Sequence, residues 1–230
     1  MKTLGVIGGL GPESTIEYYK FLIAEYRERQ TDGSYPSLFI NSVNLTKVVD
    51  LITANRLPEV TEYLAAEVNK LALAGAELGL LTANTPHIVF EEIQRRSRIP
   101  LISIVEAACQ EAQELRLKKL MLLGTRFTMQ GRFYPDVFSK AEIKLVVPSP
   151  KDCDYIHEKY MGELLKGIIL PETRTGLLEI VDRIKQQEQI QGVILAGTEL
   201  PLILRGAGGD LPFLDTTEIH VRAAISRILS

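Results

Sequence analysis

Four apolar runs of this sequence each lead into a short segment of glycine, hydroxyl and amide residues. The segments are Gly8–Ser14 (GGLGPES), Thr82–His87 (TANTPH), Gly124–Thr128 (GTRFT) and Gly197–Glu199 (GTE). Threonine and asparagine side chains can donate hydrogen bonds, and glycine lets the backbone approach a ligand closely. Pro12 suits the first position of a helix, and a helix N-terminus attracts anions. We therefore expect the first loop to hold a carboxylate, and the other segments to supply further donors.

Six residues of these segments are candidate ligand-binding residues, and two more are candidate bases. The binding candidates are Gly9, Asn84, Thr85, Thr125, Thr128 and Thr198, and the candidate bases are His87 and Glu199. Each has a plainer structural interpretation. Thr and Asn side chains also cap helices, and an acidic residue near a helix start is favoured by the helix dipole. His87 could equally be an ordinary surface residue at the start of a helix.

The same residues argue against a nucleotide or metal site. From Gly9 the pattern reads G-x-G-x-x-S, so the third glycine of a dinucleotide-binding loop is missing, and the second apolar run leads to Asn44 rather than to an acid. The three histidines, His87, His157 and His220, lie far apart, and neither C-x-x-C nor H-E-x-x-H occurs. We expect no cofactor and no metal.

Apolar runs of strand length alternate with amphipathic stretches of helix length. The expected strands are Leu4–Ile7, Ser37–Val43, Leu78–Leu81, Leu101–Ile104, Leu120–Leu123, Ile143–Val147, Gly192–Leu195 and Phe213–Leu214. The expected helices are Glu13–Arg29, Leu57–Ala74, Ile88–Ser97, Glu106–Leu115, Thr128–Phe138, Tyr155–Gly167, Glu172–Gln187 and Thr217–Leu229. This alternation predicts an α/β fold with helices on both faces of parallel sheets.

The chain also repeats itself. Val6–Gly9 has a counterpart in Leu122–Thr125, an apolar strand that ends in glycine ahead of a helix, and Leu80–Pro86 has a counterpart in Leu195–Pro201. The two motifs lie about 75 residues apart in both halves. A repeat of this size predicts two similar α/β lobes.

We expect the first lobe to span residues 1–100 and to include a returning C-terminal helix at about 216–230, and the second to span 101–215. Ligands of open α/β sheets bind beyond the carboxyl ends of the strands. Two such lobes facing each other would form a ligand cleft lined by the four polar segments and by Val43–Lys47.

The charge, the apolar runs and the cysteine count of the sequence argue against several classes of binding partner. The 230 residues carry a formal net charge of −3, without the basic face of a nucleic-acid binder. No run approaches the roughly 20 apolar residues of a membrane span, and the N-terminal apolar run stops at Gly8, unlike a signal peptide. Two cysteines are typical of a reducing compartment without a disulfide framework. We expect a cytoplasmic protein that binds neither nucleic acid nor membrane.

Several ordered motifs together resemble the aspartate/glutamate racemase family. They are GGLGPEST near the N-terminus, ANTPH after the third strand, LGTRFTM, GVILAGTELPL, and DTTEIH near the end, and they cover nearly the whole chain. The resemblance implies two Rossmann-like lobes related by a pseudo-two-fold axis, with the ligand cleft between them. It also implies cofactor-free racemisation of a small acidic amino acid such as aspartate or glutamate, and a homodimer.

The sequence departs from the family at both catalytic positions. The family places one cysteine two residues before the Asn-Thr of the first motif and another directly before the Thr-Glu of the second, which are Thr82 and Gly197 here. Racemisation without a cofactor needs an acid and a base on opposite faces of the α-carbon, and a thiol can serve as either. A threonine hydroxyl is a poor base without an activating neighbour, and glycine has no side chain. We expect the two-thiol reaction to be lost or strongly impaired.

The remaining cysteines offer no obvious replacement. Cys109 lies in an expected helix among alanines, where a small packed residue is typical. Cys153 lies before an expected helix, and its neighbours Asp152 and Asp154 would raise its pKa rather than lower it.

Three functional hypotheses therefore stay open. The chain could be an enzyme that handles a dicarboxylate with one base, Glu199 or His87, and with Thr82 as a hydrogen-bond donor, acting as an isomerase, a lyase or a hydrolase. It could be a non-catalytic protein that binds or senses an acidic amino acid. It could also be a structural or regulatory subunit. Replacing both Thr82 and Gly197 by cysteine is expected to create or raise racemase activity.

Overall fold

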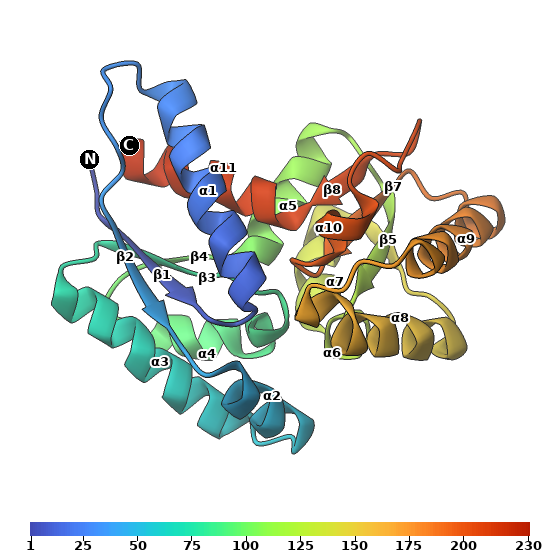
Figure 1. Cartoon of the computed structure of the whole chain (residues 1–230), viewed down its shortest axis with the longest axis horizontal. Coiled ribbons are helices and arrows are strands. Elements are labelled where there is room, and N and C mark those ends of the chain that lie inside the picture. The colour runs from blue at the N-terminus through green and yellow to red at the C-terminus, as the bar shows by residue number, and fades with distance from the viewer. The chain divides into compact units, whose positions relative to one another are not determined.

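The computed structural model describes residues 1–230 and divides into two compact units. Unit 1 consists of Met1–Ile104 together with Thr217–Ser230, and unit 2 consists of Val105–Thr216. Figure 1 shows the chain coloured along its length, with strands at the centre of each unit and helices packed on them. Each unit has its own sheet and its own core, so each is described by itself.

Unit 1 is built on four parallel strands in the order β2-β1-β3-β4. Its elements are β1 (Leu4–Gly8), α1 (Pro12–Arg29), β2 (Leu38–Ser42), α2 (Leu45–Thr53), α3 (Leu57–Ala74), β3 (Leu78–Leu81), the 3-10 helix η1 (Thr85–Val89), α4 (Phe90–Arg96), β4 (Leu101–Ile102) and α11 (Thr216–Leu229). The central strands β1 and β3 are buried along their whole length because helices cover both faces of this sheet.

Alternation along β1 assigns the two faces of this sheet. Leu4 and Val6 belong to a core cluster with buried side chains of α1 and α11, including Tyr18 and Ile225. Gly5 points the other way, because a Cβ on it would lie 3.0 Å from the Cβ of Leu71 on α3. In Figure 1, α1 and α3 accordingly run along opposite faces of the sheet.

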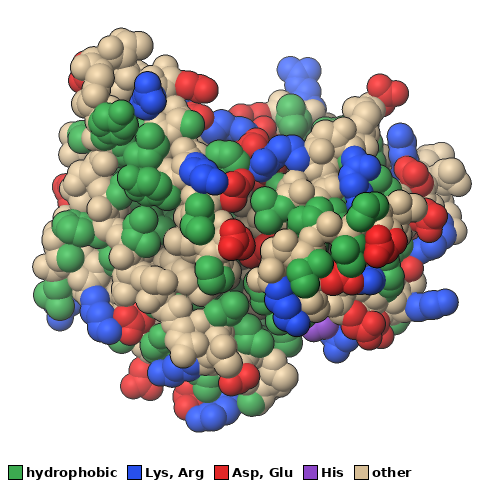
Figure 2. All heavy atoms as spheres, in the orientation of Figure 1, with side chains coloured by type: hydrophobic (Ala, Val, Ile, Leu, Met, Phe, Trp, Pro, Cys, Tyr) green, Lys and Arg blue, Asp and Glu red, His purple; other side chains and the backbone are tan.

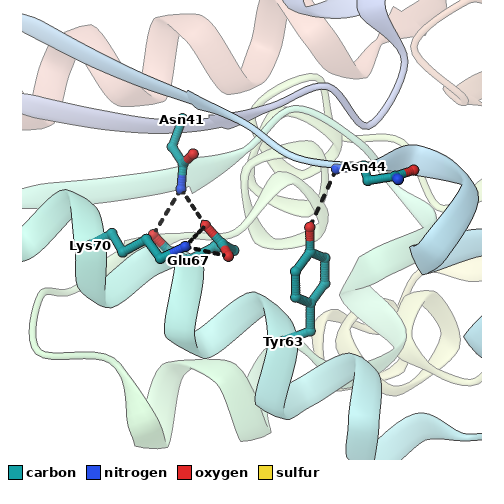
Figure 3. A network of polar contacts seen from close by, with 5 residues as sticks. All are labelled: Asn41, Asn44, Tyr63, Glu67 and Lys70. Carbon is teal, nitrogen blue, oxygen red and sulfur yellow. Dashed lines mark hydrogen bonds and ion pairs between the residues drawn. The ribbon is translucent and has the colours of Figure 1, made fainter.

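Polar contacts fix the edge strand β2 and the start of α2 on α3 (Figure 3). The side chain of Asn41 donates to Glu67 over 2.8 Å, and Lys70 pairs with the same carboxylate. Partial burial acts to raise the pKa of Glu67, but the hydrogen bonds from Lys70 and Asn41 lower it overall. Asn44 caps α2 by accepting from the backbone N–H of Lys47, and its own N–H donates to the Tyr63 hydroxyl over 3.3 Å. The segment after β2 is therefore held by its own unit.

Unit 2 is built on four parallel strands in the order β6-β5-β7-β8. Its elements are α5 (Ile104–Glu114), β5 (Lys119–Gly124), α6 (Arg126–Met129), α7 (Phe133–Phe138), the 3-10 helix η2 (Ser139–Ala141), β6 (Lys144–Val146), α8 (Pro150–Gly162), the 3-10 helix η3 (Leu164–Lys166), α9 (Pro171–Glu188), β7 (Gly192–Ala196), α10 (Leu200–Leu204) and β8 (Phe213–Asp215). One core cluster joins β5 and β7 to the buried faces of α8 and α9.

The two sheets have the same order, with the first strand of each unit between its second and third, so the repeat seen in the sequence is a repeat of topology. The predicted α/β fold with parallel sheets is confirmed, and each of the eight expected strands is present. Two helices were not expected: α2, which begins after the cap Asn44, and the short α10. The single helix expected over Thr128–Phe138 is two helices, and Gly131 lies between them at a point where a Cβ would be 2.6 Å from the carbonyl oxygen of Phe127.

None of the helices has the length and apolar character that a membrane span requires. Figure 2 shows charged side chains spread among apolar ones on the face that it presents.

Candidate functional site

The loop after β1 is a tight turn made possible by glycine. Gly9 has φ of 76°, and a Cβ on it would lie 2.4 Å from the carbonyl oxygen of Val43. Its N–H donates to the Thr15 hydroxyl over 2.9 Å. Gly11, with φ of 131°, precedes α1, which has Pro12 at its start. The sequence predicted that Gly9 binds ligand, and the structure shows its amide engaged within the loop.

Thr82 lies directly after β3 and is fully buried. Its hydroxyl donates to the carbonyl oxygen of Ile7 over 3.1 Å, and the hydroxyl of Thr15 lies 3.4 Å away. The carbonyl oxygen of Thr82 accepts from the Ser14 hydroxyl over 3.0 Å. Neither Ser14 nor Thr15 is a base that could activate the Thr82 hydroxyl, so these contacts join the loops after β1 and β3 without creating a nucleophile.

His87, one of the two candidate bases, is buried and has both ring nitrogens bonded to the backbone. Nδ1 lies 2.9 Å from the carbonyl oxygen of Ala83, which can only accept, so this nitrogen carries the proton. Nε2 then accepts from the N–H of Ile104 over 3.3 Å. The ring stacks on Phe90 with centroids 4.8 Å apart. Rather than lying on the surface, His87 ties the Thr82–His87 loop to the start of α5, two residues after β4.

His220 of α11 is held in a comparable way. Its Nε2 donates to the carbonyl oxygen of Ile102 over 2.9 Å, and its Nδ1 accepts from the Tyr18 hydroxyl over 2.8 Å. Burial lowers the pKa of His220 to about 4, and burial together with the neighbouring His220 lowers that of His87 to about 3. Both rings are therefore neutral at pH 7, and both serve to position the backbone of unit 1.

The other binding candidates of unit 1 begin the 3-10 helix η1. Asn84 is buried at its start, and its carbonyl oxygen accepts from the N–H of His87 over 2.9 Å. Thr85 is the first residue of η1 and is partly exposed. Asn84, Thr85 and Thr82 thus come from one continuous segment, which His87 anchors at its far end.

In unit 2, Thr125 and Thr128 form the loop after β5. The Thr125 hydroxyl accepts from the N–H of Thr128 over 3.3 Å and so caps α6, as the capping alternative predicted. The two hydroxyl oxygens lie 3.2 Å apart. Both side chains are buried. In this structure, Thr125 and Thr128 therefore act as the N-terminal cap of α6, directly after β5.

The loop after β7 carries the one buried carboxylate of the candidate set. Glu199 is 1% exposed, and its Oε2 accepts from the Thr198 hydroxyl over 3.0 Å. The Tyr160 hydroxyl of α8 donates to the same oxygen in a very short hydrogen bond. Burial, followed by the charge of Glu199 and its hydrogen bond, raises the pKa of Tyr160 well above its usual value. The phenol therefore keeps its proton at neutral pH and gives a hydrogen bond to Glu199.

Gly197, where the resemblance predicts the second cysteine position, lies against the same phenol. A Cβ placed on Gly197 would be 2.5 Å from Cε2, 3.0 Å from Cζ and 2.9 Å from the hydroxyl oxygen of Tyr160. Carbon atoms in ordinary contact are about 3.5–4.0 Å apart, so the ring occupies the space that a side chain at residue 197 would need. The absent side chain of Gly197 and the bulk of Tyr160 are complementary.

Tyr160 is the residue that the sequence interpretation missed. The sequence placed it only within an expected helix, on the face that carries Cys153 and Ile156, which is typical of core packing. No local signal relates it to Gly197 and Glu199, because that relation arises from packing of α8 on the carboxyl end of β7.

Neither cysteine lies in this loop cluster. Cys153 is buried in the core of unit 2, where Sγ lies 3.4 Å from the carbonyl oxygen of Pro148. Burial, Asp152 and Asp154 raise its pKa, as expected from the sequence. Burial and Glu106 raise the pKa of Cys109. No group of three or more His, Cys, Asp or Glu side chains is arranged to hold a metal ion.

Comparison with known proteins gives consistent results over the whole chain. A broad specificity amino-acid racemase of Bacillus subtilis, RacX, is 23% identical over 239 residues, covering 99% of this chain and 98% of its own. The structure of an aspartate racemase homologue from Pyrococcus horikoshii is 33% identical with a TM-score of 0.86, and both chains are covered completely.

A structure from Yersinia pestis assigned as an Asp/Glu racemase is 29% identical over the full length of both chains, with a TM-score of 0.91. The two-lobed glutamate racemase of Francisella tularensis shares the fold, with a TM-score of 0.70 at 14% identity, and 99% of this chain and 81% of that one are covered. The family described as Asp/Glu/Hydantoin racemase matches residues 7–224. The chain therefore belongs to the Asp/Glu/hydantoin racemase family.

Proposed function

We propose that this chain binds a small acidic amino acid, such as aspartate or glutamate, and does not carry out two-thiol racemisation. Its family acts on small-molecule amino acids. The observation that carries the proposal is the state of the two family-cysteine positions. Thr82 is a buried hydroxyl bonded to a backbone carbonyl, and Gly197 is covered by Tyr160. A missing acid or base costs about 10²–10⁴-fold in rate, so losing both removes the ordinary reaction.

The nature of the loops supports an acidic ligand. Hydroxyl and amide side chains at the carboxyl ends of the strands, Asn84, Thr85, Thr125, Thr128 and Thr198, are suited to a carboxylate, because Thr and Asn supply neutral donors. The name of the Pyrococcus relative, an aspartate racemase homologue, points to the same ligand class. Small side-chain movements on ligand binding would let these hydroxyl and amide groups exchange their present hydrogen bonds for bonds to the ligand.

The proposed chemistry needs no cofactor. Proton removal next to a carboxylate is a step that protein side chains can perform, and this chain offers Tyr160 and Glu199 in unit 2. In unit 1, His87 is proposed to position the binding loop rather than to act as a base, since both of its ring nitrogens are engaged by the backbone.

Binding is tested by isothermal titration calorimetry with each enantiomer of aspartate and glutamate, and with alanine as a control that lacks the second carboxylate. We expect saturable binding of at least one acidic enantiomer and none of alanine. Asn84→Ala and Thr198→Ala are expected to weaken that binding. Heat effects no larger for the acidic amino acids than for alanine would refute the proposed ligand class.

A second candidate is a one-base isomerase or lyase on a dicarboxylate, and a specific observation favours it over a purely binding role. The Tyr160 hydroxyl and the Glu199 carboxylate form a buried hydrogen-bonded pair next to Gly197. A phenol and a carboxylate in hydrogen-bond contact are groups that can take part in proton transfer, which an enzyme uses and ligand binding does not require. Nuclear magnetic resonance in deuterated water separates the two, since only the enzyme exchanges the α-proton of its ligand.

We also propose the homodimer that the family resemblance implies. Ile16, Tyr19 and Ile40 are 49%, 50% and 43% exposed on the α1 side of the unit 1 sheet, where Figure 2 shows apolar side chains among charged ones. A contiguous patch of exposed apolar side chains marks a contact surface more often than single ones do, and Ile16 and Tyr19 are three positions apart on one helix. Light scattering after size exclusion should give twice the chain mass, and a monomer with full ligand binding would contradict this proposal.

A further inference from the structure

The phenol of Tyr160 stands where the side chain of a residue at position 197 would begin. Its hydroxyl oxygen is 2.9 Å from the site of a Cβ on Gly197, and its Cε2 is closer still at 2.5 Å. A cysteine there would project its sulfur from that same Cβ. The ring is held by the core of unit 2, with Met121, Leu195 and Leu177 in the same cluster. The phenol is therefore a fixed group and not a side chain that swings through empty space.

A second group stands behind the phenol. The Tyr160 hydroxyl donates to Oε2 of Glu199, which also accepts from Thr198. Structural packing alone needs only an apolar ring beside Gly197, since phenylalanine would fill the same volume. Burying a hydroxyl and a carboxylate costs folding free energy that an apolar ring would not, so the Tyr160–Glu199 pair suggests a functional role.

We propose that Tyr160 takes the place of the second family thiol and is the proton-transfer group of unit 2, with Glu199 as the residue that positions it and accepts its proton. The inference rests on the proposed function, since the proton that is transferred is the α-proton of the bound acidic amino acid. Tyr160 is then the catalytic residue, and Glu199 acts through it.

The step conserves atoms and charge. In one concerted step, the C–H bond at the α-carbon breaks and its proton bonds to the hydroxyl oxygen of Tyr160, while the proton that Tyr160 already carried moves to Oε2 of Glu199. The Glu199 carboxylate is therefore the net base, and Tyr160 relays the proton to it. The electron pair of the broken bond moves into the ligand carboxylate as an enediolate. Reversal restores the amino acid, and a deuteron reaches the α-carbon once Glu199 and Tyr160 have exchanged with solvent. The raised pKa of Tyr160 keeps its phenol protonated in the resting state, from which this step begins.

We propose that the proton returns on the face of the α-carbon from which Tyr160 removed it. In unit 1 the family-thiol position holds Thr82, whose hydroxyl donates to Ile7 and has no base beside it. A proton removed through Tyr160 therefore returns through Tyr160. We expect deuterium to enter one enantiomer of the ligand with retention of configuration, and the mirror image not to accumulate.

The experiment compares wild-type protein with Tyr160→Phe, Glu199→Gln and Tyr155→Phe in deuterated water. Each enantiomer of aspartate and glutamate is followed by proton resonance for loss of the α-proton and by chiral chromatography for inversion, while calorimetry measures Kd. Tyr155 is also on α8, but its ring lies against Gly176 and not against Gly197. Tyr155→Phe is therefore the matched control, because it removes a phenol hydroxyl from the same helix.

We expect Tyr160→Phe to reduce the exchange rate by about 10²–10⁴-fold, with Kd changed by less than about threefold. Glu199→Gln should reduce exchange at similar Kd, and Tyr155→Phe should match the wild type. A merely structural role would move Kd or folding instead of the rate alone.

Two results would overturn the inference. Binding without any exchange in the wild type would remove the proton-transfer role and leave the proposed ligand class standing. Exchange that persists at the wild-type rate in a folded Tyr160→Phe protein would assign the proton to another group. Absence of binding to all four amino acids would instead overturn the proposed function, and the inference would fall with it.

Discussion

The loops after β3 and after β7 occupy equivalent places in two sheets of the same order. Each carries a position where the family resemblance predicts a cysteine, yet the two positions differ in opposite ways. In unit 1, Thr82 is a small hydroxyl absorbed into backbone hydrogen bonding with Ile7. In unit 2, Gly197 gives up its side chain and a large phenol from α8 fills the space. The two sheets have the same strand order, but the residues that follow their corresponding strands differ in the chemistry that they can perform.

The difference shows which unit retains the means to move a proton. The side-chain groups in hydrogen-bond contact with Thr82 are the hydroxyls of Ser14 and Thr15. The two buried histidines of unit 1 are neutral, and their bonds to backbone carbonyls lie within the unit. Around Gly197 a phenol and a carboxylate share a hydrogen bond. The contacts of unit 1 hold its loops in place, whereas those of unit 2 bring a phenol and a carboxylate into hydrogen-bond contact.

The largest effect is expected when cysteines are placed at residues 82 and 197 and the Tyr160 ring beside residue 197 is removed. From the sequence alone we expected racemase activity from Thr82→Cys with Gly197→Cys. The structure changes that expectation, because the Tyr160 ring blocks residue 197, and the double variant should remain nearly inactive. Adding Tyr160→Leu removes the ring atoms Cε2 and Cζ. The triple variant should convert L- to D-aspartate or the glutamate pair at least about 10²-fold faster than the double variant.

Chiral chromatography of the product measures this conversion, with circular dichroism as the control for folding. A double variant as active as the triple one would show that Tyr160 does not obstruct position 197.

Stability measurements test the same complementarity without any ligand. Gly197→Cys should lower the free energy of unfolding by about 1–3 kcal/mol, the usual cost of overpacking. In a Tyr160→Leu background the same change should cost at least about 1 kcal/mol less. Gly162→Cys is the matched control, because nothing lies within 4 Å of a Cβ at Gly162. Denaturant unfolding gives these values, and equal costs in both backgrounds would argue against the packing described.

The pH dependence of stability should reveal the neutral histidines of unit 1. The pKa of His87 is about 3 and that of His220 about 4 in the folded state, below the usual 6.5. The unfolded chain therefore binds more protons between pH 6.5 and 4, and stability present above pH 6.5 is lost as pH falls. Each histidine contributes a slope of up to about 1.4 kcal/mol per pH unit.

Unfolding by denaturant at several pH values measures the slope, and His220→Gln should reduce it. His157→Gln in unit 2 should reduce it less, since His157 is only half-buried and its pKa is lowered by partial burial and Arg126 while Asp154 and Glu158 oppose this. Equal slopes for the two variants would remove this contrast between the units.

The smallest effect is expected at Cys153. Its sulfur is buried in the core of unit 2 and its pKa is raised by burial and by two aspartates, so it is not a substitute for the missing thiols. Cys153→Ala should lower stability by about 1 kcal/mol and change α-proton exchange by less than about twofold. Cys109→Ala is the matched control. Loss of exchange in the Cys153 variant alone would mean that this thiol takes part in the reaction.

Local sequence patterns predicted the strands well because each strand is a short apolar run. Thr125 was recognised as a possible cap since capping depends on residues three apart. The helix α2 was missed although Asn44 offered a cap, because the interpretation read Val43–Lys47 as a loop. Helix α8 begins at Pro150, earlier than expected, since Ser149 caps it by accepting from the N–H of Asp152.

The contacts of the candidate site could not be predicted from the sequence, because they join residues that lie far apart along the chain. The bonds of His87 reach Ile104, and those of Tyr160 reach Glu199, 39 positions along the chain. Such pairs depend on how helices pack on strand ends, and no periodicity or spacing encodes them. The family motifs located the loops, but only three-dimensional packing identified the phenol that fills the place beside Gly197.

The central claim is that Tyr160 stands in for the second thiol, and a crystal structure of the wild-type protein soaked with aspartate tests it most directly. The account predicts that the Tyr160 hydroxyl oxygen lies about 3–3.5 Å from the α-carbon of the bound amino acid, as proton transfer requires, with Glu199 behind it. A ligand bound with its α-carbon far from Tyr160, or a Tyr160 ring turned away to leave open space beside Gly197, would contradict it.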